Sequence, residues 1–276
     1  MVHGINFSAL LPIANVEALE SRGQRRLAEA KAVVRKAHPE VTVEVDLQHA
    51  DPIPALVELS RHARLVVVGS RGLGGFSGIL AGSTALGLVT RGHCPVVVVR
   101  GLAPGEAPPT QGPVVVGVDG SPTSEGAITL AFEEASMRNV DLVAAHTWID
   151  FSDDYSYAYA HQFFMDWERI ETEEKELLAQ RLAGWREKYP DVVVQPVVTR
   201  DRPVRHLLKQ AADAQLVVVG SRGRGGISGM LLGSTSRALI YHAPCPVIIA
   251  RPITAAPAPS PTVAPAPSLR PEQVYQ

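Results

Sequence analysis

Two stretches of this chain place glycines where they can bind phosphate. Each has the spacing G-x-x-G, nine further residues and then G-S, and the later copy consists of Gly220, Gly223, Gly233 and Ser234. Glycines let a loop turn at positive φ and let a ligand approach the backbone N–H groups, while a following helix adds donors and the positive end of its dipole. The pattern predicts a phosphate-binding loop between a strand and a helix; turns that only connect the two elements are the alternative.

The earlier stretch is a copy of the later one. Residues 65–100 and 216–251 align without a gap at an offset of 151 and agree at 21 of 36 positions. The corresponding residues of the first copy are Gly69, Gly72, Gly82 and Ser83. A repeat of this length predicts two domains of one α/β fold.

Hydrophobic patterning around each loop predicts alternating helices and strands. In the first copy, a helix with Asp51 as its N-cap is expected over 53–61, and in the second a helix capped by Ser121 over 123–138. The other helices are expected over 16–37, 83–91, 168–188 and 203–211. Strands are expected over 41–47, 65–68, 96–99, 114–118, 142–147, 192–198, 216–219 and 247–250.

With this doubled motif the sequence resembles the universal stress protein family, whose nucleotide-binding members carry G-2x-G-9x-G-[ST] after the fourth strand. The resemblance covers nearly all of the chain to about residue 251, as a tandem pair. It implies an open parallel five-stranded sheet in the order 3-2-1-4-5 with flanking helices. It also implies ATP as the ligand, with or without magnesium.

The second copy is expected to hold a complete adenine-nucleotide site. Asp119 follows the strand 114–118, at the carboxyl end where open α/β sheets bind ligands; a carboxylate that only forms a turn is the alternative. The resemblance implies that Asp119 contacts the adenosine part and that the backbone of Thr147 meets the adenine. The predicted binding residues are Gly117, Val118, Asp119, Thr147, Gly220, Ser221, Arg222, Gly223, Arg224, Gly225, Gly226, Gly233, Ser234 and Thr235.

The alignment leaves the first copy without a counterpart of residues 114–151, because Met1 falls opposite Ser152. It lacks the first two strands and the equivalent of Asp119, and a genuine truncation and a start at an internal methionine both fit. We therefore expect one ATP per chain, in the second copy. The expected parts are an incomplete domain over 1–100, a linker over 101–112, a complete domain over 113–251 and a disordered Pro/Ala-rich tail over 252–276.

Composition excludes several functional classes. Hydrophobic residues make up 46% of the chain, charged residues 20%, and the net charge is -2, so the chain is globular and has no electrostatic footprint for nucleic acid or an anionic membrane. No apolar run is long enough to span a membrane and no signal peptide is recognisable, which predicts a cytoplasmic protein. Cys94 and Cys245, at equivalent positions of the two copies, are expected to be buried thiols.

Catalytic and metal-binding motifs are not found. The sequence has no P-loop lysine, dinucleotide fingerprint, nucleophile elbow or zinc motif, and His146, His206 and His242 share no partner signature. This favours an ATP-binding stress or regulatory protein with at most slow hydrolysis. An adenylate-using hydrolase or transferase on the same scaffold and a non-binding interaction module are the alternatives.

Two further stretches bear on assembly. The last strands of the copies, 96–99 and 247–250, are apolar edges, so the copies are expected to pair with each other there; a homodimer is the other assembly that such edges allow. The aromatic stretch 149–167 either packs on its own domain or forms a lid near the adenine or a contact with the other copy.

Overall fold

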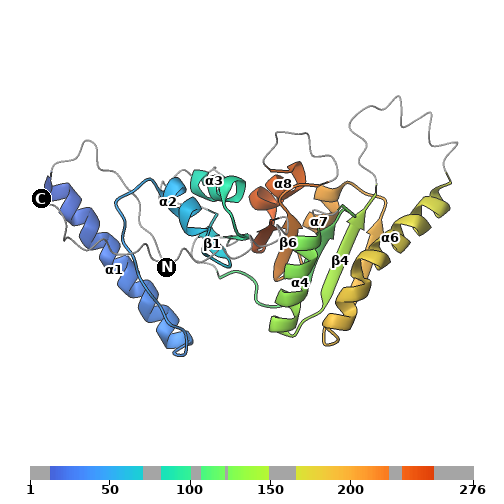
Figure 1. Cartoon of the computed structure of the whole chain (residues 1–276), viewed down its shortest axis with the longest axis horizontal. Coiled ribbons are helices and arrows are strands. Elements are labelled where there is room, and N and C mark those ends of the chain that lie inside the picture. The colour runs from blue at the N-terminus through green and yellow to red at the C-terminus, as the bar shows by residue number, and fades with distance from the viewer. Residues whose placement is uncertain are drawn as a thin grey trace, which may run out of the picture.

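Helices and strands alternate along the chain in a computed structural model that describes residues 13–70, 82–100, 107–121, 124–148, 166–223 and 232–251 (Figure 1). The helices are α1 (Ile13–Ala37), α2 (Pro52–Leu59), α3 (Ser83–Arg91), α4 (Glu125–Arg138), α6 (Trp167–Lys188), α7 (Pro203–Ala211) and α8 (Ser234–His242). The strands are β1 (Val66–Gly69), β2 (Val96–Val99), β3 (Val114–Val118), β4 (Leu142–Thr147), β5 (Val194–Thr199), β6 (Leu216–Gly220) and β7 (Val247–Ala250).

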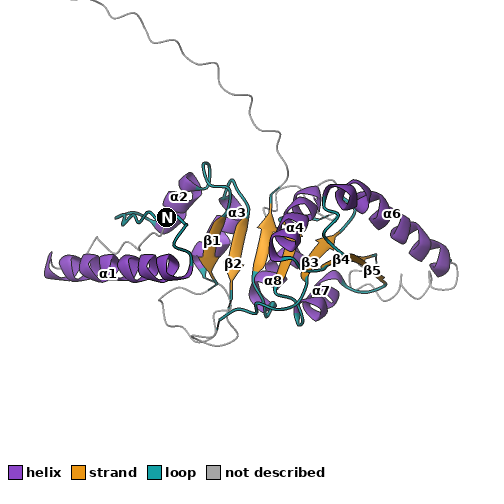
Figure 2. Ribbon diagram, turned by 90° about the horizontal axis from the view of Figure 1, so that it is seen from below, coloured by secondary structure: helices purple, strands orange, loops and turns teal. Residues whose placement is uncertain are grey.

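The strands form one seven-stranded sheet in the order β1-β2-β7-β6-β3-β4-β5 (Figure 2). Neighbouring strands are parallel except β2 and β7, which run antiparallel with Val97 opposite Ile248. The two copies therefore meet edge to edge through their last strands, as expected. Because this pairing satisfies the backbone groups of both edges, the two copies share a single mixed sheet. Within it the second copy has the order β5-β4-β3-β6-β7, which is the expected order 3-2-1-4-5.

Successive residues of the strands point to opposite faces of the sheet and fill two cores. On one face α3, α7 and α8 cover a core that includes Val98, Val217 and Leu239. On the other face α4 and α6 cover a core that includes Phe132 and Ile248. The helices that follow β3 and β6 consequently lie on opposite faces of the sheet.

The strand expected over 41–47 is wrong. These residues belong to no strand, and Val41 and Val45 stay 46% and 40% exposed. An alternating apolar pattern is not sufficient for a strand, because the backbone also needs a neighbour to bond with. In the described part of the first copy, β1 pairs only with β2 and no strand is paired on its other side.

The expected N-cap of the helix after β3 is also wrong, whereas that of α2 is confirmed. The carboxylate of Asp51 accepts from the Ile53 N–H at 3.1 Å. Helix α4 begins at Glu125 with Ser124 as its N-cap. The hydroxyl and the N–H of Ser124 donate to the Ser121 carbonyl at 2.8 and 3.1 Å, so Ser121 meets the start of the helix through its carbonyl, while its own hydroxyl donates to Asp119 Oδ1 at 2.7 Å.

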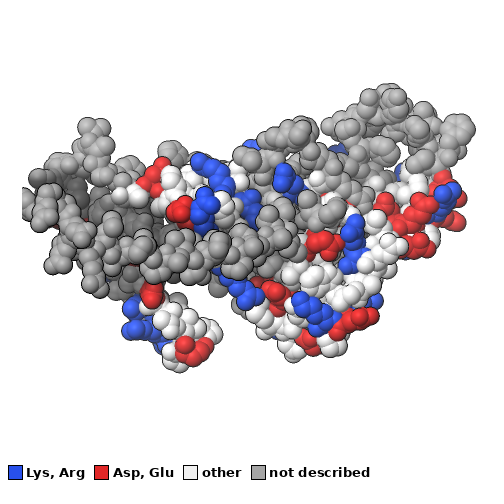
Figure 3. All heavy atoms as spheres, viewed as in Figure 1, with Lys and Arg blue, Asp and Glu red and all other residues white. Residues whose placement is uncertain are grey.

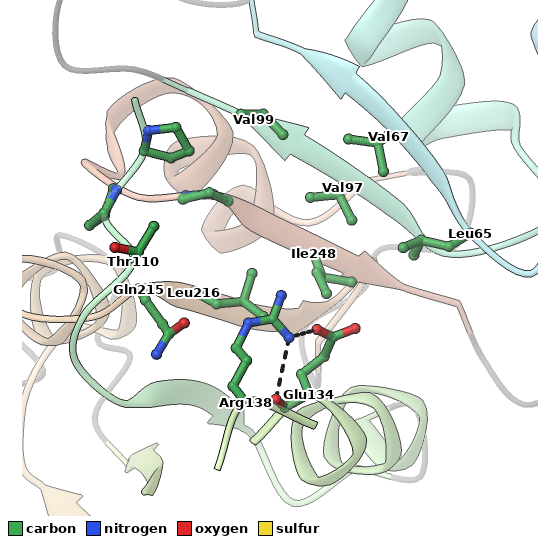
Figure 4. A pocket seen from close by; sticks show the side chains of 13 residues that line it. Leu65, Val67, Val97, Val99, Thr110, Glu134, Arg138, Gln215, Leu216 and Ile248 are labelled. Atoms are coloured by element: carbon green, nitrogen blue, oxygen red, sulfur yellow. Dashed lines mark hydrogen bonds and ion pairs between the residues drawn. The ribbon is translucent and has the colours of Figure 1, made fainter. Parts of the chain in front are cut away.

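The face of β1 on the side of α4 is uncovered, whereas Val97 on the same face of β2 is only 8% exposed. Val67 on this face is 58% exposed, whereas its counterpart Val218 in the second copy is 0% exposed. The strands, residues 108–110 and the side chains of Glu134 and Arg138 line a groove of about 340 Å³ there (Figure 4). Most side chains of α1, which lies beyond β1 in Figures 1 and 2, are exposed as well.

Several stretches with sequence predictions lie outside the described residues. They include the tail over 252–276, the first half of the linker (101–106), most of the aromatic stretch (149–165) and the middle of each glycine loop (71–81 and 224–231). Among the helices of the described part of the chain, none is both long enough and apolar enough to cross a membrane.

Candidate functional site

The candidate site lies at the carboxyl edge of the sheet between β6 and β3. From β3 the chain crosses over through α4 to β4, and from β6 it crosses through α8 to β7, so the two connections leave in opposite directions along the sheet. They also lie on opposite faces. Such a switch point opens a crevice at the carboxyl ends of the strands, where α/β proteins bind ligands.

Asp119 and Gly223 face each other across this switch point. A Cβ atom on Gly223 would lie 2.9 Å from Asp119 Oδ2, closer than side chains tolerate. The other carboxylate oxygen, Oδ1, accepts from the N–H of Ser121 at 3.0 Å and from its hydroxyl at 2.7 Å. The carboxylate after β3 is thus oriented toward the glycine loop, and a side chain at position 223 would force this carboxylate to move.

Backbone hydrogen bonds fasten both ends of the glycine loop. The Ser221 N–H donates to the Ala250 carbonyl on β7 at 3.0 Å, and the Gly233 N–H donates to the Ser221 carbonyl at 2.8 Å. The Ser236 hydroxyl donates to the Gly220 carbonyl at 2.6 Å. These bonds hold the start of α8 against the end of β6.

The N-terminus of α8 is open to a ligand. Gly233 is the N-cap and supplies no side-chain hydrogen bond, so the first-turn N–H groups around Ser234 and Thr235 have no side-chain cap. Unpaired donors and the positive end of the helix dipole favour an anion at this position. The loop and helix can therefore hold phosphate without a lysine.

The loop of the first copy is fastened in the same way. The Ser70 N–H donates to the Val99 carbonyl at 2.8 Å, and the Gly82 N–H donates to the Ser70 carbonyl at 2.7 Å. Gly82 is likewise an N-cap without a side-chain bond, at the start of α3. Each glycine loop, together with the start of the helix that follows it, is called a cradle below. The two cradles differ in their neighbours, since β1 is the edge strand of the sheet and has no counterpart of β3 beside it.

The remaining predicted residues lie at the ligand edge, inside the sheet or outside the described residues. Thr147 ends β4, next to β3. Gly117 packs inside the sheet, because an added Cβ would meet Val219 Cγ1 at 3.0 Å and Leu207 Cδ1 at 3.1 Å. Its side of the strand therefore has no space for a ligand. The predicted residues Arg224, Gly225 and Gly226 lie outside the described residues.

A buried histidine supports the ligand edge, which the sequence did not reveal. His146 is fully buried, with Nδ1 2.6 Å from the Val118 carbonyl and Nε2 2.7 Å from Glu174 Oε2. A carbonyl oxygen only accepts, so Nδ1 carries a hydrogen, and the contact between Nε2 and the carboxylate then contains one shared proton.

The helix α6 also fastens the turn that carries Asp119. Arg181 on α6 donates to the Gly120 carbonyl at 2.8 Å and pairs with Glu125 at 3.2 Å. Together with the contact between Glu174 and His146, this bond fixes the end of β3 from the face opposite to α8. Glu174 and Arg181 are seven residues apart, the spacing of one helix face, and this spacing is the sequence signal that could have indicated that both contact the end of β3.

Replacing His146 with leucine is expected to lower the free energy of unfolding by about 2–3 kcal/mol, because the Val118 carbonyl and the Glu174 carboxylate lose a buried partner. Denaturant unfolding at neutral pH measures this. His206→Leu is the matched control, since His206 is 5% exposed and its Nε2 has no hydrogen-bond partner among the described residues. It should change the free energy by less than about 1 kcal/mol; equal losses in both variants would contradict the role of His146.

The two thiols are structural, as expected. Both Cys94 and Cys245 are buried and free of disulfides. Burial raises the pKa of the Cys94 thiol and raises the pKa of the Cys245 thiol to about 12. A nucleophile must be a thiolate, so neither residue is suited to covalent catalysis at neutral pH.

Charge on the described surface is mixed. Figure 3 shows lysines and arginines interspersed with acidic residues on the face it presents, in keeping with the net charge of -2. No group of three or more His, Cys, Asp or Glu side chains in the described ranges could hold a metal ion. A ligand phosphate would thus be held by the local loop and helix.

Comparisons with known proteins agree with this architecture. A model of the universal stress protein family matches residues 5–100 and 112–251. A universal stress protein of Mycobacterium bovis is 43% identical over 235 residues, covering 84% of this chain and 78% of the relative, and one of Mycobacterium tuberculosis is 44% identical over 236 residues, covering 82% and 74%. The crystal structure of a universal stress protein from Archaeoglobus fulgidus matches with a TM-score of 0.60 at 20% identity, covering 90% of this chain and 83% of that one. This chain belongs to the universal stress protein family.

Proposed function

We propose that this chain binds ATP and acts as a regulatory or stress-response protein with at most slow hydrolysis. The observation that carries this proposal is the position of Asp119 Oδ2, 2.9 Å from where a Cβ of Gly223 would lie. It brings a carboxylate, which can accept from sugar hydroxyls, directly beside a loop suited to phosphate. A sugar phosphate can use both groups at once.

The order of the strands supports an adenine nucleotide lying along the edge of the sheet. Thr147 at the end of β4 would meet the adenine, Asp119 at the end of β3 the sugar, and the loop after β6 the phosphates. ATP can bring magnesium on its own phosphate oxygens, because this ion keeps several waters and usually binds through substrate phosphates. The Ser234 and Thr235 hydroxyls would add hydrogen bonds to the phosphates.

We further propose one ATP per chain, bound in a complete domain over 113–251 that follows an incomplete domain over 1–100 and a linker over 101–112. Two observations support this. The alignment gives the first copy no equivalent of Asp119, and Val67 is 58% exposed where its counterpart Val218 lies under α4 with 0% exposure. The first cradle would therefore lack the adenosine contacts that bury much of a ligand of this size.

Calorimetric titration of the full chain with ATP, with and without magnesium, tests the proposal. We expect a stoichiometry near one and a rise in the melting temperature, since a hundredfold excess over Kd adds about 2.7 kcal/mol to the free energy of unfolding. Two equal sites per chain would contradict the single-site proposal. No binding at millimolar ATP would contradict the function itself, and phosphate release over many turnovers would assign the chain to the hydrolases.

A further inference from the structure

Arg251 joins the ligand edge of the second copy to the first copy. It follows β7 directly, and its Nη2 donates to the Leu88 carbonyl at 3.3 Å and to the Val89 carbonyl. Both carbonyls belong to the last turns of α3. A cation at this position satisfies end carbonyls and complements the negative end of the helix dipole.

Arg100, the counterpart of Arg251 at the end of β2, makes the reciprocal contact. Its Nη1 donates to the Tyr241 carbonyl in the last turn of α8. The antiparallel pairing of β2 with β7 produces this exchange, because it brings the carboxyl end of each strand beside the helix that precedes the other. The two arginines thus make matched contacts between the copies, but each stands at the cradle of its own copy.

The guanidinium of Arg251 is not saturated by these bonds. Its Nε is buried and has no hydrogen-bond partner among the described residues. Burial lowers the pKa of Arg251; the neighbouring Cys94 raises this pKa, and the charge of Arg222 lowers it. A buried donor without a partner costs free energy that a bound acceptor would recover.

Arg222 brings a second positive charge to the same place. The hydrogen bond from the Ser221 N–H to the Ala250 carbonyl, 3.0 Å long, continues the parallel pairing of Gly220 with Ala250, so that Ser221 lies beside Arg251 and Arg222 is the next residue along the chain. Arg222 is exposed, and neither guanidinium forms an ion pair within the described ranges. Two like charges that form no ion pair with a described carboxylate favour an anion.

The order of the strands indicates which anion this is. At the carboxyl edge the neighbouring strands are β4, β3, β6 and β7 in turn. Thr147 and Gly220 end β4 and β6, and Asp119 and Arg251 directly follow β3 and β7. Three strand spacings, about 14 Å, separate the first from the last. A nucleotide with its adenosine at β4 and β3 has its first phosphate at β6, so that only a longer phosphate chain extends to β7.

Resting on the nucleotide site proposed above, we propose that Arg222 and Arg251 form a subsite for the terminal phosphates of a nucleoside triphosphate. The subsite makes the site select ATP over AMP. Since the same guanidinium caps α3, the terminal phosphates of the ligand also come into contact with the junction between the copies. Arg251 is a ligand-binding residue in this proposal, and its bonds to α3 orient it.

Dissociation constants for ATP and AMP, measured on the full chain by calorimetry, test the subsite. Arg251→Gln should weaken ATP binding about tenfold or more, since hydrogen bonds to charged groups contribute at this level, and should change AMP binding less than about twofold. Arg251→Lys should retain part of the preference because it keeps the charge but loses the forked geometry. Arg222→Gln, at an exposed position, should shift the ratio in the same direction without affecting the fold.

The matched control is Arg100→Gln, which removes the reciprocal contact between the copies but lies at the other cradle. It should lower the melting temperature as Arg251→Gln does and leave the ratio of ATP to AMP affinity unchanged. The subsite would be overturned if Arg251→Gln left the ratio of ATP to AMP affinity unchanged, or if Arg100→Gln shifted this ratio equally. If the wild-type chain binds AMP and ATP equally, the subsite fails and the nucleotide site stands; if it binds neither, both proposals fail.

Discussion

Replacing Gly223 with valine is expected to abolish ATP binding, with a loss of at least about a hundredfold in affinity. The first atom of any side chain at this position would lie 2.9 Å from Asp119 Oδ2 and would displace that carboxylate. The rest of the side chain would occupy the space in which the phosphates approach the loop. Calorimetric titration with ATP measures the effect, and circular dichroism confirms that the variant is folded.

Gly72 provides the control for this variant, because it holds the same place in the motif of the first copy. It lies outside the described residues, and a valine there should leave ATP affinity nearly unchanged if the second copy alone binds. An alanine at Gly184 on α6 adds a control for the fold, since nothing lies within 4 Å of its added Cβ. ATP binding that survives in the Gly223 variant would contradict the proposed site.

Replacing Val98 with lysine is expected to lower the free energy of unfolding by about 3–5 kcal/mol and to loosen the junction between the copies. Val98 is 1% exposed on β2 and lies directly opposite Val247 of β7 in the antiparallel pair. A lysine there would place an unpaired charge in the core beneath α3 and α8. Denaturant unfolding measures the loss, and small-angle scattering measures the dimensions of the chain.

The same substitution at Val67 is the matched control. Val67 lies on the neighbouring strand β1 and is 58% exposed, so a lysine there can keep its charge in water. We expect a change within about 0.5 kcal/mol. Equal losses in the two variants, or unchanged stability and dimensions for the lysine at position 98, would show that the junction does not depend on this buried contact.

The site resembles a binding site more than a catalytic one. Its described polar groups are backbone donors, hydroxyls, one carboxylate and two arginines, and Asp119 is already held by Ser121. The buried His146 is engaged on both nitrogens and is enclosed by the sheet, so it cannot serve as a general base for a ligand. This agrees with the proposal of a protein that binds ATP with little turnover.

The sequence by itself determined the repeat, the glycine cradle and most of the elements. Helix α7 over 203–211, helix α3 over 83–91 and strand β4 over 142–147 have the predicted bounds. Local periodicity is sufficient to predict these elements, because the hydrogen bonds of a helix and the burial of a strand follow a regular pattern along the chain. Asp119 could be predicted for the same reason, since a buried parallel strand ends where its apolar run ends.

Only the tertiary structure decided how distant segments meet. Residues 41–47 form no strand, because no neighbouring strand supplies hydrogen bonds there, and α4 begins only at Glu125, with Ser124 as its N-cap. It joined His146 to Glu174 and Arg251 to the end of α3, partners 28 and 162 residues apart in the chain. Such contacts leave no period in the sequence, since they arise only when an antiparallel edge and two opposite helix layers bring the segments together. These long-range contacts determine which charged side chains lie around the cradle, whereas the sequence motif determines only the cradle.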